Sequence, residues 1–187
     1  MKNLIEVTKE KHNKFLKEVK DEFALYIENV DYSILKVNPN HSNKTKEYST
    51  IVKISKYEDL ENIIYGKGFY IILTDCKYNE NKCKLEMIQD SIKIKAIYRG
   101  HCTQVKNRIE SHLFNQKHNK SEKSTKYEVC MKIEENEQGI NIDEEPYKDN
   151  VFYVIQTKMK NSNEIMREAM EYGFDEKYGR PFASREK

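Results

Sequence analysis

The stretch "AIYRGHCTQVKNRIESH", residues 96–112, predicts a strand that ends in Tyr-Arg-Gly and leads into a helix. Arg108 and His112 would lie on one face of that helix, because residues four apart are neighbours on a helix surface. Tyr98 would stand at the end of the strand that feeds the helix. A hydrophobic core does not need this set of polar groups, whereas a site for a negatively charged substrate would use it.

The rest of the chain also reads as a mixture of strands and helices. Alternation over residues 91–100 places four side chains on one strand face: Ile92, Ile94, Ala96 and Tyr98. Periodicity predicts further strands at 48–54, 68–75, 127–133 and 151–158, and helices at 8–30, 55–66, 103–114 and 162–178. Thr8 and Ser55 are the expected N-caps of the first two helices. The chain shows no internal repeat and no Gly/Ser linker, which favours one catalytic-type domain preceded by an N-terminal helical extension.

Composition limits the class of protein. With 34% charged and 37% hydrophobic residues over 187 positions, the chain can form one domain with a real core. No apolar run approaches the roughly 20 residues that span a bilayer, and the N-terminus lacks the apolar core of a signal peptide. We therefore expect a cytoplasmic protein with no membrane partner. The four cysteines lack the close spacing of a zinc site, so reduced thiols are expected.

The net charge of the chain does not by itself identify its binding partner. The net charge of +2 neither requires nor excludes nucleic acid, so the placement of the charges matters more. Residues 115–126 are basic and residues 134–149 are acidic. The charges are therefore unevenly placed along the chain.

Taken one at a time, the candidate site residues have ordinary explanations. Tyr70 and Tyr98 are unremarkable strand aromatics in a chain with 13 tyrosines. Arg108 and His112 fit a solvated helix face, and Glu171 fits a surface acid. Their order along the chain and their expected secondary structure, taken together, favour a shared site.

That order resembles the GIY-YIG nuclease superfamily. "GFY" (68–70) looks like the first tripeptide of the family, and "YRG" (98–100) looks like the second. Arg108 follows Tyr98 by ten residues and His112 follows by four more, as is usual in the family. The last predicted helix supplies a glutamate where the family has its metal ligand.

The resemblance covers about residues 66–184 and includes three departures. Arg99 stands where the second tripeptide has Ile, and the segment between the tyrosines is longer than in compact members. Ser184, after Pro181, stands where the family has an Asn. The resemblance implies an α/β (α+β) fold, a small mainly antiparallel sheet flanked by helices. It would occupy residues 66–187, preceded by a helical and strand extension at 1–65 that serves DNA binding or dimerisation.

The resemblance also implies a catalytic site for phosphodiester hydrolysis. Tyr70 would take a proton from water, Arg108 would hold the scissile phosphate, and Tyr98 with His112 would position water or assist proton transfer. Which tyrosine acts as the base stays open.

The implied metal is one Mg²⁺, with Mn²⁺ as a substitute, held by a glutamate of the last helix. Glu164, Glu168 and Glu171 share a face of that helix. Glu171 best fits the family distance to the later proline, and Glu168 is the second choice.

By analogy and size, the chain is most like the small type II restriction endonucleases of the superfamily. Double-stranded DNA is then the partner, and a homodimer would suit a palindromic target. Base reading is expected from the insert at 76–90, the basic loop and the N-terminal segment, and the substrate-binding candidates are His101, Lys117, Lys120, Lys123 and Ser184. The alternatives are a non-catalytic or regulatory nucleic-acid-binding protein on a nuclease fold, or a repair or mobile-element nuclease.

Overall fold

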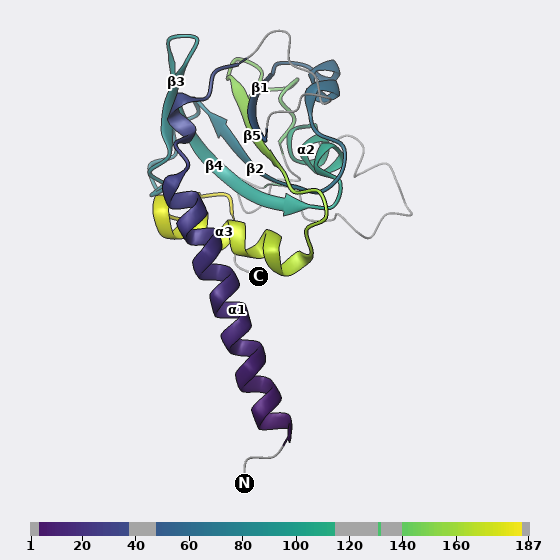
Figure 1. Cartoon of the computed structure of the whole chain (residues 1–187). Helices are drawn as coiled ribbons and strands as arrows, with labels where there is room; N and C mark the ends of the chain where they lie inside the picture. The colour runs from purple at the N-terminus through teal and green to yellow at the C-terminus, as the bar shows by residue number, and fades with distance from the viewer. Residues whose placement is uncertain (1–3, 38–47, 115–130, 132–139, 185–187) are drawn as a thin grey trace.

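A computed structural model describes residues 4–37, 48–114, 131 and 140–184 of the chain. Its centre is an antiparallel sheet of five strands in the order β1-β5-β2-β4-β3, with helices on both faces (Figure 1). The predicted α+β class, with an antiparallel sheet, flanking helices and an N-terminal helix, is confirmed. The strands are β1 (Ser49–Ile54), β2 (Gly68–Thr74), β3 (Glu86–Gln89), β4 (Ile92–Cys102) and β5 (Phe152–Lys158). The helices are α1 (Leu4–Asn29), α2 (Val105–Leu113) and α3 (Glu164–Tyr178), with short 3₁₀ turns η1 (Tyr32–Ile34) and η2 (Tyr57–Asn62).

The sheet is buried on both faces, so the chain has two hydrophobic cores. Side chains alternate between faces along a strand, and every residue of β2 is buried. Tyr70 and Ile72 enter the core that includes α2 and η2, and we call this side the α2 face. Phe69 and Ile71 enter the core that includes α3 and the end of α1, and we call this side the α3 face.

Helix α1 packs on α3 through its C-terminal part, while its N-terminal part extends away from the sheet (Figure 1). The crossing is close at Gly173, where an added Cβ would lie 2.8 Å from the Phe23 carbonyl oxygen. The Lys177 ammonium donates to the Val30 carbonyl at 2.7 Å and to two further carbonyls at the end of α1. This contact places a positive charge at the negative end of the helix dipole.

The predicted N-caps of the first two helices are wrong. Thr8 lies inside α1, and its hydroxyl donates to the Leu4 carbonyl 2.8 Å away, because nothing in residues 4–7 interrupts the helix. Residues 55–66 form only η2, where Asp59 accepts hydrogen bonds from the backbone N–H groups of Ser55 and Lys56. A carboxylate is a strong acceptor for such groups, so Asp59 and not the Ser55 hydroxyl fixes the turn.

A β-bulge in β4 overturns the predicted strict alternation. Ile72 pairs with Tyr98 but Leu73 pairs with Ala96, so Ile97 is an extra residue. Ala96 therefore lies on the α3 face, and Tyr98 lies on the α2 face with Tyr70. The bulge therefore places the Tyr98 side chain on the α2 face.

Strand β3 was not predicted; it lies in the insert that we expected to read DNA bases. It forms a hairpin with β4, in which Met87 pairs with Ile94. The turn consists of Asp90 and Ser91, both with positive φ. Asn-Gly or Asp-Gly is the usual signal for such a turn, so Asp-Ser was easy to miss.

The structure also bears on several other expectations from the sequence. Strand β1, which falls within the expected N-terminal extension, pairs with β5 and so belongs to the same sheet as β2. The strand predicted at 127–133 lies outside the described residues except for Met131. Among the described residues, no helix has the length and apolarity required to cross a bilayer. The described cysteines Cys76, Cys83 and Cys102 form no disulfide.

Candidate functional site

Two tyrosines, an arginine and a histidine meet on the α2 face. β2 carries Tyr70, β4 carries Tyr98, and α2 carries Arg108 and His112. The tyrosine rings are stacked with centroids 6.1 Å apart, and the His112 ring centroid lies 4.4 Å from that of Tyr98. The Arg108 guanidinium is hydrogen-bonded to both tyrosine hydroxyls. We call these four residues the tyrosine–arginine cluster. Sequence reasoning placed the four in one site together with Glu171, whose partners in the structure are Arg99 and His101.

Gly100 makes room for the cluster. It pairs with Tyr70 across β2 and β4, and the Tyr70 ring lies over its Cα. A Cβ at this position would lie 2.7 Å from the Tyr70 hydroxyl oxygen and 3.0 Å from a Tyr98 ring carbon. Both distances are shorter than a normal contact, so a larger residue would displace one of the two tyrosines.

The hydrogen bonds of His112 define its tautomer. Its Nδ1 accepts a hydrogen bond of 2.8 Å from the Met131 backbone N–H, so Nδ1 carries no proton. The proton of the neutral ring is therefore on Nε2, which lies 3.0 Å from the Tyr70 hydroxyl oxygen and donates to it. His112 and Tyr70 are both buried, so this pair is a fixed part of the cluster.

Burial, more than charge, controls the protonation of Tyr70. Burial raises the pKa of Tyr70 well above its usual value, and the nearby Tyr98 adds to the rise, while Arg108 opposes it. Burial alone would lower the pKa of Arg108. The interactions of its guanidinium with the Tyr70 and Tyr98 hydroxyls together have a larger effect, so the pKa of Arg108 is raised. Tyr70 is thus a neutral phenol next to a permanent cation. Tyr98 is only half-buried and is the more accessible phenol.

Glu171 lies on the α3 face, where a buried arginine and a histidine hold it. Its Oε2 is 2.8 Å from Arg99 Nη1, and its Oε1 is 3.0 Å from His101 Nδ1. Arg99 also donates two hydrogen bonds, of 3.0 and 2.6 Å, to Asp175. Burial alone would lower the pKa of Arg99, but Asp175 and Glu171 outweigh it and raise the pKa. The expected metal ligand is therefore engaged in an ion-pair network.

Ser184 holds the C-terminal segment against β4. Its hydroxyl accepts a 3.0 Å hydrogen bond from the Arg99 backbone N–H and lies 3.4 Å from the Arg99 carbonyl oxygen. Ala183 adds a backbone hydrogen bond of 2.9 Å to Ile97, the bulge residue. The contacts give Ser184 a positioning role beside "YRG", and its expected contact with substrate stays a prediction.

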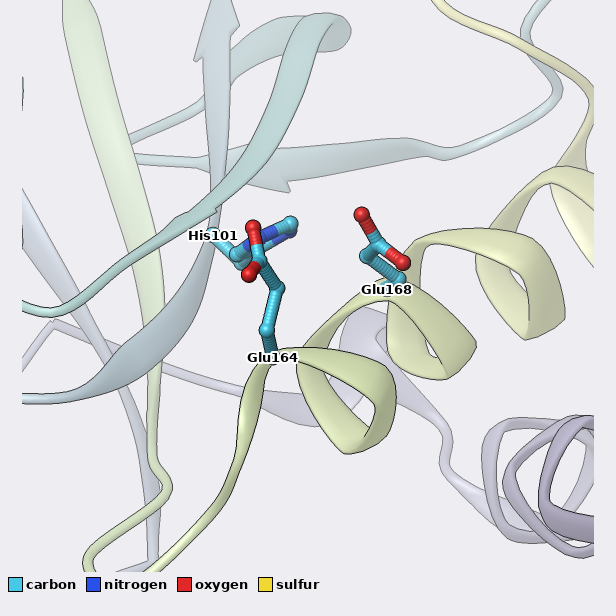
Figure 2. Close-up of side chains that lie close together, drawn as sticks. All are labelled: His101, Glu164 and Glu168. Atoms are coloured by element: carbon cyan, nitrogen blue, oxygen red, sulfur yellow. The ribbon is translucent and has the colours of Figure 1, made fainter. Parts of the chain in front are cut away.

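A second group of possible ligands lies beside Glu171. His101, Glu164 and Glu168 each offer a ligand atom, and these atoms all lie within 4.8 Å of one another (Figure 2). The two glutamates are exposed on successive turns of α3, and the imidazole of His101 extends toward them from β4. Sequence reasoning selected Glu171 and Glu168, treated His101 as a substrate contact, and gave Glu164 no role. The three expected DNA-binding lysines, Lys117, Lys120 and Lys123, lie outside the described residues.

Sequence reasoning also missed the partners of Arg99. A charged residue within an apolar strand needs carboxylates nearby if the strand is buried on both faces. Glu171 and Asp175 are four apart on the last helix and could have been proposed as those carboxylates. Finding them required knowledge of which helix covers β4.

No model of a protein family matches the chain, and neither a curated protein nor a solved structure matches it. The resemblance to the GIY-YIG superfamily stays a prediction.

Proposed function

We propose that this protein is a cytoplasmic, metal-dependent endonuclease that hydrolyses phosphodiester bonds of double-stranded DNA. The observation that supports this most is the tyrosine–arginine cluster, in which Arg108 is hydrogen-bonded to two phenols beside a histidine of defined tautomer. A permanent cation next to proton-transfer groups suits a reaction that builds negative charge on a phosphate.

Each residue of the cluster has a distinct role in the proposal. Arg108 presents its planar guanidinium to the scissile phosphate, a geometry that lysine does not offer. Tyr98, the half-buried tyrosine, orients the attacking water; after it has released its own proton to solvent, its phenolate accepts the proton of that water. Tyr70 and His112 are buried, and they hold Arg108 in position through the Tyr70 hydroxyl. Tyr98 thereby replaces Tyr70 as our candidate base.

The proposal also includes a divalent ion; its candidate ligands lie on the α3 face, whereas the tyrosine–arginine cluster lies on the α2 face. The carboxylates of α3 fit such an ion, because hard cations bind carboxylate oxygens and water. Glu171 fits less well than sequence reasoning suggested, since both of its oxygens are engaged by Arg99 and His101. Glu164 and Glu168 are exposed and adjacent to His101, so their oxygens are the better supported ligands.

The narrower proposal is a type II restriction endonuclease that acts as a homodimer. It rests on the family resemblance. The extended part of α1 would be available to a second subunit or to DNA, since Leu4, Ile5 and Phe15 are exposed.

Cleavage of plasmid DNA tests the activity. We expect supercoiled plasmid to be cut in the presence of Mg²⁺ or Mn²⁺ and to stay intact in excess EDTA. Sequencing of the new ends would then identify the recognised site. DNA binding without cleavage under every metal condition would instead favour the non-catalytic alternative, for which the ion-paired Glu171 is the main support.

A further inference from the structure

We propose that His101, Glu164 and Glu168 form a binding site for a first-row divalent metal ion of the Mn²⁺ type, with Glu171 as the carboxylate that orients His101. This site does not depend on nuclease activity, because binding of the ion is measured without DNA. It differs from a single-glutamate site in three ways: an imidazole takes part, Glu164 is a ligand, and Glu171 is not.

The geometry already approaches that of a bound ion. Ligand atoms about 2.1 Å from a common metal ion can be up to about 4.2 Å apart. The three candidate atoms lie within 4.8 Å of one another, so small rotations of the exposed glutamates would complete the site. His101 comes from a strand, and the glutamates come from two turns of one helix, so the backbone holds all three in place (Figure 2).

The second observation is the state of His101. Its side chain is only 8% exposed, and its Nδ1 lies 3.0 Å from the Glu171 oxygen Oε1. A carboxylate only accepts hydrogen bonds, so Nδ1 carries the proton, and the lone pair of the neutral ring is on Nε2. Within the described residues, no hydrogen bond engages Nε2. A carboxylate that orients a metal-binding histidine in this way is common in metal sites.

Charge also favours a cation at this position. Glu164 and Glu168 are four apart on α3, where like charges repel. Glu171 and Asp175 continue the acidic row, and the positive charge of Arg99 is paired with those two residues. A divalent ion between Glu164 and Glu168 would reduce this repulsion.

The donor set selects the class of metal. One imidazole nitrogen and two carboxylates suit Mn²⁺, Fe²⁺, Co²⁺ or Zn²⁺, whereas Mg²⁺ and Ca²⁺ favour oxygen ligands alone. We therefore expect the site to bind Mn²⁺ more tightly than Mg²⁺.

Titration of the EDTA-treated full chain with Mn²⁺, followed by electron paramagnetic resonance of the free ion, tests the site. The wild type should bind one Mn²⁺ per chain. Glu171→Gln should weaken binding by about 10–100-fold, as expected for a residue that orients a ligand. Glu164→Gln, Glu168→Gln and His101→Ala should each weaken it by more. The matched controls Glu176→Gln, exposed on the same helix, and His12→Ala, exposed on α1, should bind as the wild type does.

Thermal melting of each variant separates loss of the site from loss of the fold. Binding that survives both Glu164→Gln and Glu168→Gln would overturn the proposal, as would a wild type that binds no Mn²⁺. Complete loss in Glu171→Gln alone would mean that Glu171 is the ligand. Equal affinity for Mg²⁺ and Mn²⁺ would contradict the imidazole ligand. DNA cleavage is scored separately, so an intact Mn²⁺ site in an inactive protein would count against the proposed function only.

Discussion

Tyr70 and Tyr98 are the same residue type in different environments. Tyr70 is buried and hydrogen-bonded to His112, and burial raises its pKa. Tyr98 is half-buried on the same face and, like Tyr70, is hydrogen-bonded to Arg108. A proton acceptor has to reach the attacking water, so exposure favours Tyr98 for that role.

The two phenylalanine variants should therefore behave differently. Tyr98→Phe removes the proposed proton acceptor and should slow single-turnover DNA cleavage by about 10²–10⁴-fold, with little change in DNA affinity. Tyr70→Phe removes the buried hydrogen bonds of the Tyr70 hydroxyl to His112 and Arg108, so it should lower the free energy of unfolding by about 2–4 kcal/mol and affect the rate less. An inactive Tyr70→Phe beside an active Tyr98→Phe would reverse the two roles.

At the level of elements, the close crossing of α1 and α3 depends on one glycine. An added Cβ at Gly173 would meet backbone atoms of Phe23 and Ala24 at 2.8 to 3.0 Å. Backbone cannot move aside as a flexible side chain can. The crossing should therefore be sensitive to a single methyl group.

Helix propensity and packing make opposite predictions for Gly173→Ala. Propensity alone predicts a gain of about 1 kcal/mol, because alanine is the better helix former. We expect a net loss of about 1–3 kcal/mol, because the methyl group overpacks the crossing. Urea unfolding measures the sign. Glu176→Ala, at an exposed position of the same helix, is the matched control and should not destabilise the protein; a stabilised Gly173→Ala would show that α1 is held loosely.

Elements with a clear period were predictable, and those set by contacts between elements were not. The positions of β2, β5 and α3 follow from their apolar patterns. The bulge at Ile97 depends on pairing with β2 and on the C-terminal segment that bonds to it, so a local pattern does not reveal it. β3 was missed because it is only four residues long and its turn lacks glycine.

One part of the candidate site could be predicted from the sequence, and another part could not. Their order along the chain and the family resemblance brought Tyr70, Tyr98, Arg108 and His112 into one hypothesis, and the fold places them on the α2 face. The environment of Glu171 was not predictable, because Arg99 reaches it only when α3 covers β4. The fold does not test its predicted role as a metal ligand, and the proposed Mn²⁺ site gives Glu171 the role of orienting His101 instead.

For the whole molecule, buried tyrosines predict a loss of stability at high pH. Burial raises the pKa of Tyr32 and Tyr70 above the usual value of about 10. Above pH ~10 the unfolded chain loses these protons while the folded chain keeps them, so the free energy of unfolding falls as the pH rises. Below that pH both states are protonated, and the two groups contribute no pH dependence.

Melting temperatures measured from about pH 8 to about pH 11 would show this alkaline loss of stability, because the range spans the usual tyrosine pKa of about 10. Tyr32→Phe should flatten the alkaline decline, because it removes one of the protons that unfolding releases. Tyr65→Phe, at a position 67% exposed, serves as the control and should leave the decline unchanged. An identical decline in the wild type and in Tyr32→Phe would show that Tyr32 titrates alike in both states.

The proposed nuclease activity depends on the tyrosine–arginine cluster, and the decisive variant is Arg108→Ala. Cleavage and DNA affinity should be measured on one preparation, with the exposed neighbour Asn107→Ala as control. We predict that Arg108→Ala lowers the single-turnover rate by at least about 10²-fold, because the proposed partner of Arg108 is the charge of the transition state. Affinity should change little, and Arg108→Lys should not restore the rate. Near-normal cleavage by folded Arg108→Ala would show that the tyrosine–arginine cluster is not the catalytic site.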